Sequence, residues 1–208
     1  MVSAKDKIIY SFFKRVLDVL SSFCALIILS PIFILLAVLV KLDSSGPAFF
    51  GHRRLGKDGR IIKVYKFRTM VQNAEEALKR LTPEEKREFQ ENFKLEYDPR
   101  VTKLGSFLRK SSLDELPQLL NILIGNMTVV GPRPIVEKEL DKYGIYKYKL
   151  LTVKPGLTGN WQANGRSDTT YEERVKLDMD YIDNRSFLLD MKIIFKTFGA
   201  VVKKEGAR

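Results

Sequence analysis

The sequence feature that most restricts the fold is a long apolar stretch near the amino terminus, from Val16 to Leu42. A helix needs about 20 apolar residues to cross a bilayer, so this stretch is long enough for a span. Ser30-Pro31 interrupts it near the middle. Pro31 has no N–H to donate to the carbonyl of Ile27, and its ring crowds that turn. We therefore expect the helix to break there, with the Ser30 hydroxyl bonding to the freed backbone.

Basic residues flank this stretch on both sides. They are Lys5, Lys7, Lys14 and Arg15 before it, and Lys41, Arg53, Arg54, Lys57 and Arg60 after it. Flanks rich in lysine and arginine stay in the cytoplasm. The pattern favours a re-entrant helix that enters one leaflet and turns back at Ser30-Pro31, with a kinked single span as the alternative. No small-residue cleavage site follows, which disfavours a signal peptide.

Asp18 is an acid inside the apolar stretch, where an unpaired charge is costly. Arg15 lies three residues earlier, on the same face of a helix. We therefore expect an ion pair between these two residues that anchors the helix at the membrane interface.

Composition narrows the chemistry that the chain can perform. Its formal net charge of +11 suits nucleic acid, an anionic membrane surface or a polyphosphate ligand. Cys24 and His52 are the only cysteine and histidine, which excludes an internal disulfide and a multi-cysteine zinc site. We interpret His52 as a solvated or phosphate-facing loop residue. Catalysis must then come from carboxylates and cations, with or without a metal.

After residue 43 the pattern predicts one compact unit rather than several domains. Asp58-Gly59 is typical of a hairpin turn between strands at 48–50 and 60–67. Helices are expected at 71–81, 82–95, 101–110, 116–124, 135–152 and 187–202, the last of them either in the core or against the membrane. We predict an α+β, mostly helical chain, in which residues 1–42 form the basic segment and membrane helix. Residues 43–208 would then form a cytoplasmic or interfacial catalytic domain with a small β-hairpin.

Asp114 and Glu115 are neighbours at the start of an apolar helix. Ser112 and Glu115 have the spacing of a capping box, so the two acids could simply serve the helix end. Cations surround them, with Arg109 before and Arg133 after, and this combination also suits a phosphate bridged by a divalent metal. Because adjacent helical residues do not share a face, one carboxylate would face a reaction while the other holds the metal.

Four ordered blocks resemble a known family. They are Arg68-Thr69-Met70, Leu108–Gln118, Gly131-Pro132-Arg133-Pro134 and Pro155-Gly156-Leu157-Thr158-Gly159. In this order, and from about Phe13 to about Thr197, the chain resembles the bacterial sugar transferases, also called monotopic polyprenyl-phosphate phosphoglycosyl transferases. The resemblance implies transfer of a sugar-1-phosphate from a UDP-sugar to a polyprenyl phosphate such as undecaprenyl phosphate, with release of UMP. This would be the first membrane step of glycoconjugate assembly, at the cytoplasmic face of the bacterial inner membrane.

The family mechanism is ping-pong, which assigns roles to residues of this chain. Asp114 is implied as the nucleophile that forms an aspartyl-phosphosugar. Mg²⁺ is the implied cofactor, held by Asp114 and Glu115, because hard carboxylate and phosphate oxygens favour it. Glu115 would orient the metal or act as general base toward the lipid phosphate, and both roles stay open. The expected phosphate-binding residues are Arg109 and Arg133, followed by Lys66 and Arg68.

A glycine-punctuated loop at 154–168 supplies the remaining candidates. Arg166 and Asp168 would grip the nucleotide, or else cap the helix that begins near Thr170. The loop from Trp161 to Asp168 resembles family members that transfer hexose-1-phosphates. The sequence does not give the sugar, the polyprenyl length or the pathway, and it leaves a homodimer open.

Two other functions fit parts of the pattern. A phosphatidyl transferase would use a similar carboxylate pair and release CMP from a CDP-lipid. A non-catalytic basic protein would bind an anionic membrane or nucleic acid through charge alone, and such binding weakens steeply with salt. With the resemblance in view we expect membrane lipids, and not nucleic acid, as partners.

Overall fold

The computed structural model describes residues 4–79, 81, 82, 85–87, 95, 98–164 and 169–202. Its helices are α1 (Ala4–Ile28), α2 (Ser30–Asp43), α3 (Ala74–Lys79), α5 (Lys103–Lys110), α6 (Gln118–Ile124), α7 (Lys147–Leu150), α8 (Asn160–Asn164), α9 (Tyr171–Asn184) and α10 (Phe187–Val202). Short 3₁₀ segments are η1 (Lys57–Gly59), η2 (Leu113–Glu115) and η3 (Glu137–Tyr146), and the strands are β1 (Phe49–Leu55), β2 (Ile61–Phe67), β3 (Thr128–Val130) and β4 (Gly156–Thr158). The mostly helical α+β fold with one compact domain is confirmed.

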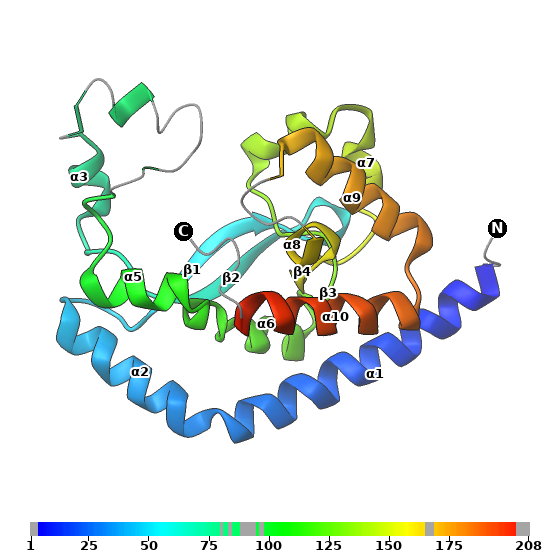
Figure 1. Ribbon diagram of the computed structural model, residues 1–208, viewed down its shortest axis with the longest axis horizontal. Helices are drawn as coiled ribbons and strands as arrows, with labels where there is room; N and C mark the ends of the chain where they lie inside the picture. Colours follow the sequence, from blue (N-terminus) through cyan, green and yellow to red (C-terminus); the bar gives the residue numbers. More distant parts are fainter. Residues whose placement is uncertain are drawn as a thin grey trace.

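Helices α1 and α2 form a bent arm along one side of the molecule, beneath α5, α6 and α10 (Figure 1). The break falls at Leu29, and Pro31 lies in the first turn of α2. The Ser30 hydroxyl donates to the carbonyl of Ile27 at 2.8 Å, the same carbonyl that Pro31 leaves without a partner. The predicted break and its local repair are both present. Among the described residues no single helix is long and apolar enough for a span, but Ile8–Ile28 and Ser30–Asp43 together are, with a bend of 64°.

The ion pair predicted between Arg15 and Asp18 is wrong. Asp18 accepts hydrogen bonds from the Thr128 hydroxyl at 2.6 Å and from the Val129 N–H at 2.9 Å. The Arg15 guanidinium donates to the last carbonyls of α6, those of Ile122 and Leu123. Both residues are therefore bound to the rest of the fold, because partners on neighbouring elements satisfy them better than a helical neighbour does.

The predicted hairpin is confirmed as the antiparallel pair β1 and β2, in a register that sets Leu55 opposite Ile61. Its turn places Asp58 in the left-handed region, with φ 58°, which aspartate tolerates better than most residues. Asn121 of α6 then fixes the hairpin, because its side-chain carbonyl accepts from Tyr65 N–H and its amide donates to the Lys63 carbonyl. Helix α6 is in this way held against the edge of β2.

A second sheet, which the sequence analysis did not predict, joins two of the four motif blocks. Strands β3 and β4 are parallel, with Thr128 opposite Gly156 and Val130 opposite Thr158. A Cβ on Gly156 would overlap the backbone of Gly131, and a Cβ on Gly159 would overlap the same glycine. Only glycine permits this approach, so the Gly-Pro-Arg-Pro block and the Pro-Gly-Leu-Thr-Gly block pack directly against each other.

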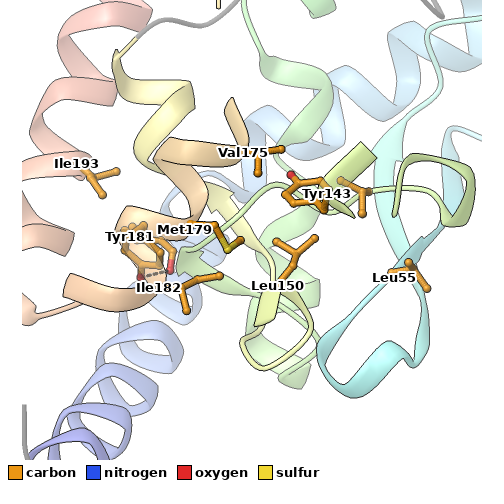
Figure 2. Packing of buried hydrophobic residues seen from close by; sticks show 10 residues of the cluster. Leu55, Tyr143, Leu150, Val175, Met179, Tyr181, Ile182 and Ile193 are labelled. Carbon is orange, nitrogen blue, oxygen red and sulfur yellow. Dashed lines mark hydrogen bonds between the residues drawn. The ribbon is translucent and has the colours of Figure 1, made fainter. Parts of the chain in front are cut away.

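The largest cluster of buried side chains lies between η3, α7, α9 and α10 (Figure 2). Tyr181 crosses this core and donates to the carbonyl of Val130 at 2.8 Å. The continuous helix predicted over 135–152 is wrong, because Gly144, with φ 51°, kinks the chain within η3, and only Lys147–Leu150 of this stretch is α-helical. Helix α10 has two faces, since Ile193 is buried in the core whereas Leu188, Phe195 and Phe198 are exposed.

The helix predicted over 82–95 lies mostly outside the described residues. Its start is described, and there Thr82 and Glu85 exchange side-chain and backbone hydrogen bonds as a capping box does. The other predicted helices are present within a few residues, as α3, α5, α6 and α10.

Candidate active site

The acidic pair lies in η2, a single 3₁₀ turn between α5 and α6. Ser112 adopts a left-handed conformation, with φ 57°, and its side chain makes no capping bond. Helix α6 begins only at Gln118, after Pro117. The capping-box alternative for Ser112 and Glu115 is therefore not realised, and the two acids precede the first residue of α6.

Both carboxylates reach one ammonium group. Lys66 Nζ lies 3.4 Å from Asp114 Oδ2 and 2.7 Å from Glu115 Oε1. The prediction that the two acids face different directions is wrong, because in this turn their side chains converge. Asp114 is the more deeply placed of the two, with a side chain 9% exposed against 27% for Glu115.

The surroundings of Asp114 and Glu115 shift the pKa values of the two carboxyl groups in opposite directions. Burial raises the pKa of Asp114 above its usual value, and the charge of Lys66 only partly offsets this. Burial acts on Glu115 in the same direction, but the charges of Lys66, Arg133 and Arg54 outweigh it and lower the pKa of Glu115. Two neighbouring carboxylates with pKa values shifted apart suit two different roles in one reaction.

Glu115 lines a shallow, open cleft. The other residues that line the cleft are His52, Arg54, Val64, Lys66, Gln118, Arg133, Pro134, Gly156, Leu157 and Gln162. The hairpin register explains why one wall is basic. Cross-strand partners share a face of a sheet, and His52 lies opposite Val64 while Arg54 lies opposite Ile62, so both share the face of Lys66.

Sequence analysis missed Arg54 and placed His52 in a loop, whereas both lie in β1. Burial and the charges of Arg54, Lys66 and Arg133 lower the pKa of His52 to about 4, so its ring is neutral at physiological pH. The Arg54 guanidinium is held between His52 and Glu139. The alternation of β1 across the Asp58-Gly59 turn was the signal that could have found both residues.

The two motif glycines fix the position of Arg133, because its rigid Gly-Pro-Arg-Pro segment packs against Gly156. The Arg133 guanidinium carbon lies 5.9 Å from the centre of the Trp161 ring. Gln162, the next residue in α8, lines the same cleft, and its buried side-chain oxygen has no hydrogen-bond partner among the described residues. This end of the cleft therefore offers a cation and a polar amide group beside an aromatic ring.

The remaining candidates fall into three places. Arg109 lies close enough to Asp114 for their charges to interact, and its Nε donates to the Thr69 hydroxyl at 3.0 Å. Arg68 is turned away from the pair, since its guanidinium donates to the carbonyls of Val40 and Ser44 at the end of α2. Arg166 and Asp168 lie outside the described residues, and the helix that follows them is capped by Thr170 with Glu173.

The carboxylates of Asp114 and Glu115 could supply some, but not all, of the ligands of a magnesium ion. Within the described ranges, no group of three or more His, Cys, Asp or Glu side chains could hold a metal. Mg²⁺ is commonly bound by one or two carboxylates together with substrate phosphates and water. Asp114 and Glu115 fit that arrangement, with the phosphates of a substrate completing the shell.

Two carboxylates that share a lysine, one of them lining a cleft rich in arginine, suit an enzyme that handles phosphorylated substrates. Comparison of the sequence with known families identifies the class of enzyme. The profile of the bacterial sugar transferase family matches residues 9–204, and the chain belongs to this family.

Curated relatives agree with this assignment. Exopolysaccharide production protein ExoY of Rhizobium meliloti (strain 1021) is 48% identical over 93% of this chain and 87% of the relative. The undecaprenyl-phosphate galactose phosphotransferase of Salmonella typhimurium is 47% identical over 94% of this chain, but over only 42% of its own length. The UDP-glucose:undecaprenyl-phosphate glucose-1-phosphate transferase of Escherichia coli (strain K12) is 42% identical over 88% of this chain and 39% of the relative. The chain thus spans less than half of the two longer relatives.

Proposed function

We propose that this protein transfers a sugar-1-phosphate, a hexose-1-phosphate in the first instance, from a UDP-sugar to undecaprenyl phosphate, with release of UMP. The observation that carries the proposal is the convergence of Asp114 and Glu115 on Lys66 at the edge of a cationic cleft. The names of the relatives from Salmonella typhimurium and Escherichia coli support the lipid acceptor and the hexose.

In the first step, a carboxylate oxygen of Asp114 attacks the phosphorus that carries the sugar. The bond from that phosphorus to the bridging oxygen breaks, UMP leaves with the electron pair, and an aspartyl-phosphosugar remains. Burial supports Asp114 in this role, because a desolvated carboxylate with a raised pKa is a better nucleophile than a solvated one. Arg109 and Arg133 would neutralise the charge that spreads over the phosphoryl oxygens.

In the second step, an oxygen of the lipid phosphate attacks the same phosphorus and Asp114 leaves as a carboxylate. The product is a polyprenyl diphosphate sugar, and the enzyme returns to its starting state. Glu115 would accept the proton of a protonated lipid phosphate or would bind the metal. Its lowered pKa supports either role, because both need the ionised carboxylate.

A bound Mg²⁺ would supply charge neutralisation at the two phosphates of the donor. The residues that would hold it are Asp114 and Glu115, which present carboxylate oxygens in one place. Lys66 then keeps the two negative side chains together when no metal is present.

The location we propose is the cytoplasmic face of the bacterial inner membrane, with α1 and α2 entering one leaflet and returning. The bent apolar pair with basic residues on both flanks supports this placement. The helices α5, α6 and α10 lie along the arm (Figure 1), and each carries an exposed apolar residue, Phe107, Ile124 and Phe198 respectively. A catalyst in that position meets the lipid phosphate where the acceptor lies.

Mass spectrometry of the intact protein tests the chemistry. Purified protein in detergent with Mg²⁺ and a panel of UDP-sugars should gain the mass of one sugar-phosphate and release UMP, and undecaprenyl phosphate should then remove the adduct. Asp114→Asn should lose the adduct and on the order of 10⁴-fold in turnover, because the nucleophile is gone. Asp141→Asn, at an exposed acid of η3, is the matched control and should retain both.

The outcomes separate the alternatives. Normal turnover in Asp114→Asn would contradict the assignment of the nucleophile, and release of CMP from a CDP-lipid would identify a phosphatidyl transferase. Glu115→Gln distinguishes the two roles of Glu115. An adduct that forms but is not passed to the lipid indicates a general base, whereas a raised Mg²⁺ requirement for adduct formation indicates a metal ligand.

Cysteine labelling tests the re-entrant topology. Single cysteines at Ser3→Cys and Ser45→Cys, in a Cys24→Ser background, should react from the same side of the membrane. In the Ser30→Ala, Pro31→Ala double variant the arm should straighten toward a span, which would bring the two positions to opposite sides. Opposite sides in the parent protein would indicate a kinked span, and no change in the variant would mean that the break does not cause re-entry.

A further inference from the structure

Three cations from separate segments lie near one another, two of them directly against the turn that follows α6. They are Arg15 of α1, Lys57 of the hairpin turn and Lys154 of the segment before β4. A Cβ on Gly125 would lie 3.3 Å from Arg15 Nη2 and 3.6 Å from Lys154 Nζ, so both cationic groups lie against the same turn. Lys57 is close enough for its charge to act on Lys154.

The backbone of the fold fixes these three positions. Asp58 N–H donates to the carbonyl of Leu151 at 2.8 Å, which joins the hairpin turn to the segment that leads to Lys154. Thr128 N–H donates to the carbonyl of Pro155 at 3.0 Å, which fixes the residue after Lys154. Arg15 is held by the carbonyls of Ile122 and Leu123. The cluster is thus a consequence of tertiary structure and not of lysines that happen to lie on a surface.

Among the described residues, no acid forms an ion pair with Arg15, Lys57 or Lys154. Asp18, whose charge acts on Lys154, has both carboxylate oxygens bonded to Thr128 and Val129. Within the part of the chain that the structure describes, the ammonium groups of Lys57 and Lys154 form no hydrogen bond and no ion pair. Burial and the charges of Arg15 and Lys57 lower the pKa of Lys154, and Asp18 offsets this only in part. An anion bound here would relieve that repulsion.

The neighbours of the cluster are apolar and exposed. Ile124, directly before Gly125, is 59% exposed, and Val16, directly after Arg15, is also exposed. None of the three cations lines the cleft beside Glu115. Lys57 is also far along the hairpin from the acidic pair, because Lys66 lies five residues into β2, roughly 17 Å from the start of the strand. A cationic group bordered by exposed apolar side chains matches a phosphate headgroup with acyl chains attached.

We propose that Arg15, Lys57 and Lys154 form a binding site for the phosphoryl headgroup of an anionic phospholipid, apart from the catalytic cleft. A lipid held there would bridge α1, the hairpin turn and the segment before β4. The site would therefore fix the orientation of the domain on an anionic bilayer, whatever the reaction in the cleft.

Thermal unfolding of the full chain in a neutral detergent tests this site. Phosphatidylglycerol added to the micelles should raise the Tm in a saturable way, whereas phosphatidylcholine should not. The double variant Lys57→Gln, Lys154→Gln should need roughly fivefold more phosphatidylglycerol for each lysine removed. The matched control Lys138→Gln, Lys176→Gln removes two exposed lysines of η3 and α9 and should respond as the parent does.

Each other outcome contradicts the proposal. Equal losses in both double variants would mean that bulk charge attracts the lipid. An unchanged response in the Lys57, Lys154 variant would mean that the lipid binds elsewhere. Inorganic phosphate that alone gives the full Tm shift, and loses it in that variant, would identify free phosphate as the ligand in place of a lipid.

Discussion

The two helices of the amino-terminal arm are attached to the domain by different means. Helix α1 is attached through polar groups, with Asp18 bonded to Thr128 and Val129 in β3, and Arg15 bonded to the end of α6. Near its start, Tyr10 and Lys14 donate to Asp190 of α10 at 2.8 and 2.6 Å. Each of these bonds has a defined direction, and they act on three different elements.

Helix α2 is attached through apolar packing. Leu36 and Val40 are buried against Ala48, Phe67 and Leu108. Among the described contacts, the polar attachment of α2 lies at its carboxyl end. There the Arg68 guanidinium donates hydrogen bonds to the carbonyls of Val40 and Ser44. The rest of the helix presents exposed apolar side chains such as Ile34 and Leu35.

The difference indicates which helix sets the position of the arm. Hydrogen bonds fix the rotation and depth of a helix, whereas apolar contacts tolerate sliding because they are not directional. In lipid, apolar packing also has little hydrophobic driving force, since the acyl chains are equally apolar. We therefore expect the polar attachments of α1 to determine how the arm lies, and the four substitutions that follow test this from the largest effect to the smallest.

Asp18→Ala should have the largest effect on stability. It leaves the buried Thr128 hydroxyl and the Val129 N–H without an acceptor, which costs about 3 kcal/mol of the free energy of unfolding. Chemical denaturation in detergent measures the loss. The exposed Asp141→Ala is the control, and a loss in Asp18→Ala no larger than in that control would overturn the comparison between the helices.

Leu36→Ala should cost somewhat less, about 2 kcal/mol, because it leaves a cavity against Phe67 and Leu108. The same denaturation experiment applies, with the exposed Ile34→Ala as control. A loss greater than that of Asp18→Ala would show that packing of α2, and not the bonding of α1, dominates the arm.

Arg15→Met keeps the aliphatic length and removes the guanidinium from two carbonyls of α6. We expect a loss of about 1.5 kcal/mol, since the Ile122 carbonyl keeps its bond from the Gly125 N–H and water can reach the exposed end of α6. Hydrogen exchange at the end of α6 should increase with it. Arg53→Met, at an exposed position of β1, should leave both quantities unchanged.

Tyr10→Phe should have the smallest effect, about 0.5 kcal/mol. The carboxylate of Asp190 keeps its bonds from Lys14 and Tyr181, so the removed hydroxyl leaves no buried group unpaired. Thermal unfolding against Tyr148→Phe, an exposed position, detects the difference. A loss comparable to that of Asp18→Ala would mean that the Asp190 contacts, not the Asp18 contacts, hold α1.

Sequence analysis predicted the features that depend on local chemistry. The break at Ser30-Pro31 follows from a missing N–H, and the hairpin follows from Asp58-Gly59, which supplies the left-handed turn. Both would hold in almost any tertiary surrounding. The four motif blocks likewise located the acidic pair and Arg133 without knowledge of the fold.

The incorrect predictions concern residues and strands whose partners are distant in the sequence. Arg15 and Asp18 were expected to bind each other, but elements more than a hundred residues away offer each a better geometry. The pairing of β3 with β4 involves strands of three residues each, too short to give a periodic signal. Arg68 was expected among the phosphate-binding residues because its motif block resembles one that borders the active site in the family, yet β2 has ended at Phe67 and the Arg68 side chain bonds to the end of α2.

The position of Arg68 connects the end of α2 to the acidic pair through a very short length of chain. Lys66 holds the two carboxylates, and Arg68, two residues later, holds the final carbonyls of the helix that we place in the leaflet. Two residues of extended chain cover roughly 7 Å. The depth at which α2 ends therefore sets the height of the carboxylates above the bilayer, and a membrane of different thickness would present the lipid phosphate to them at a different level.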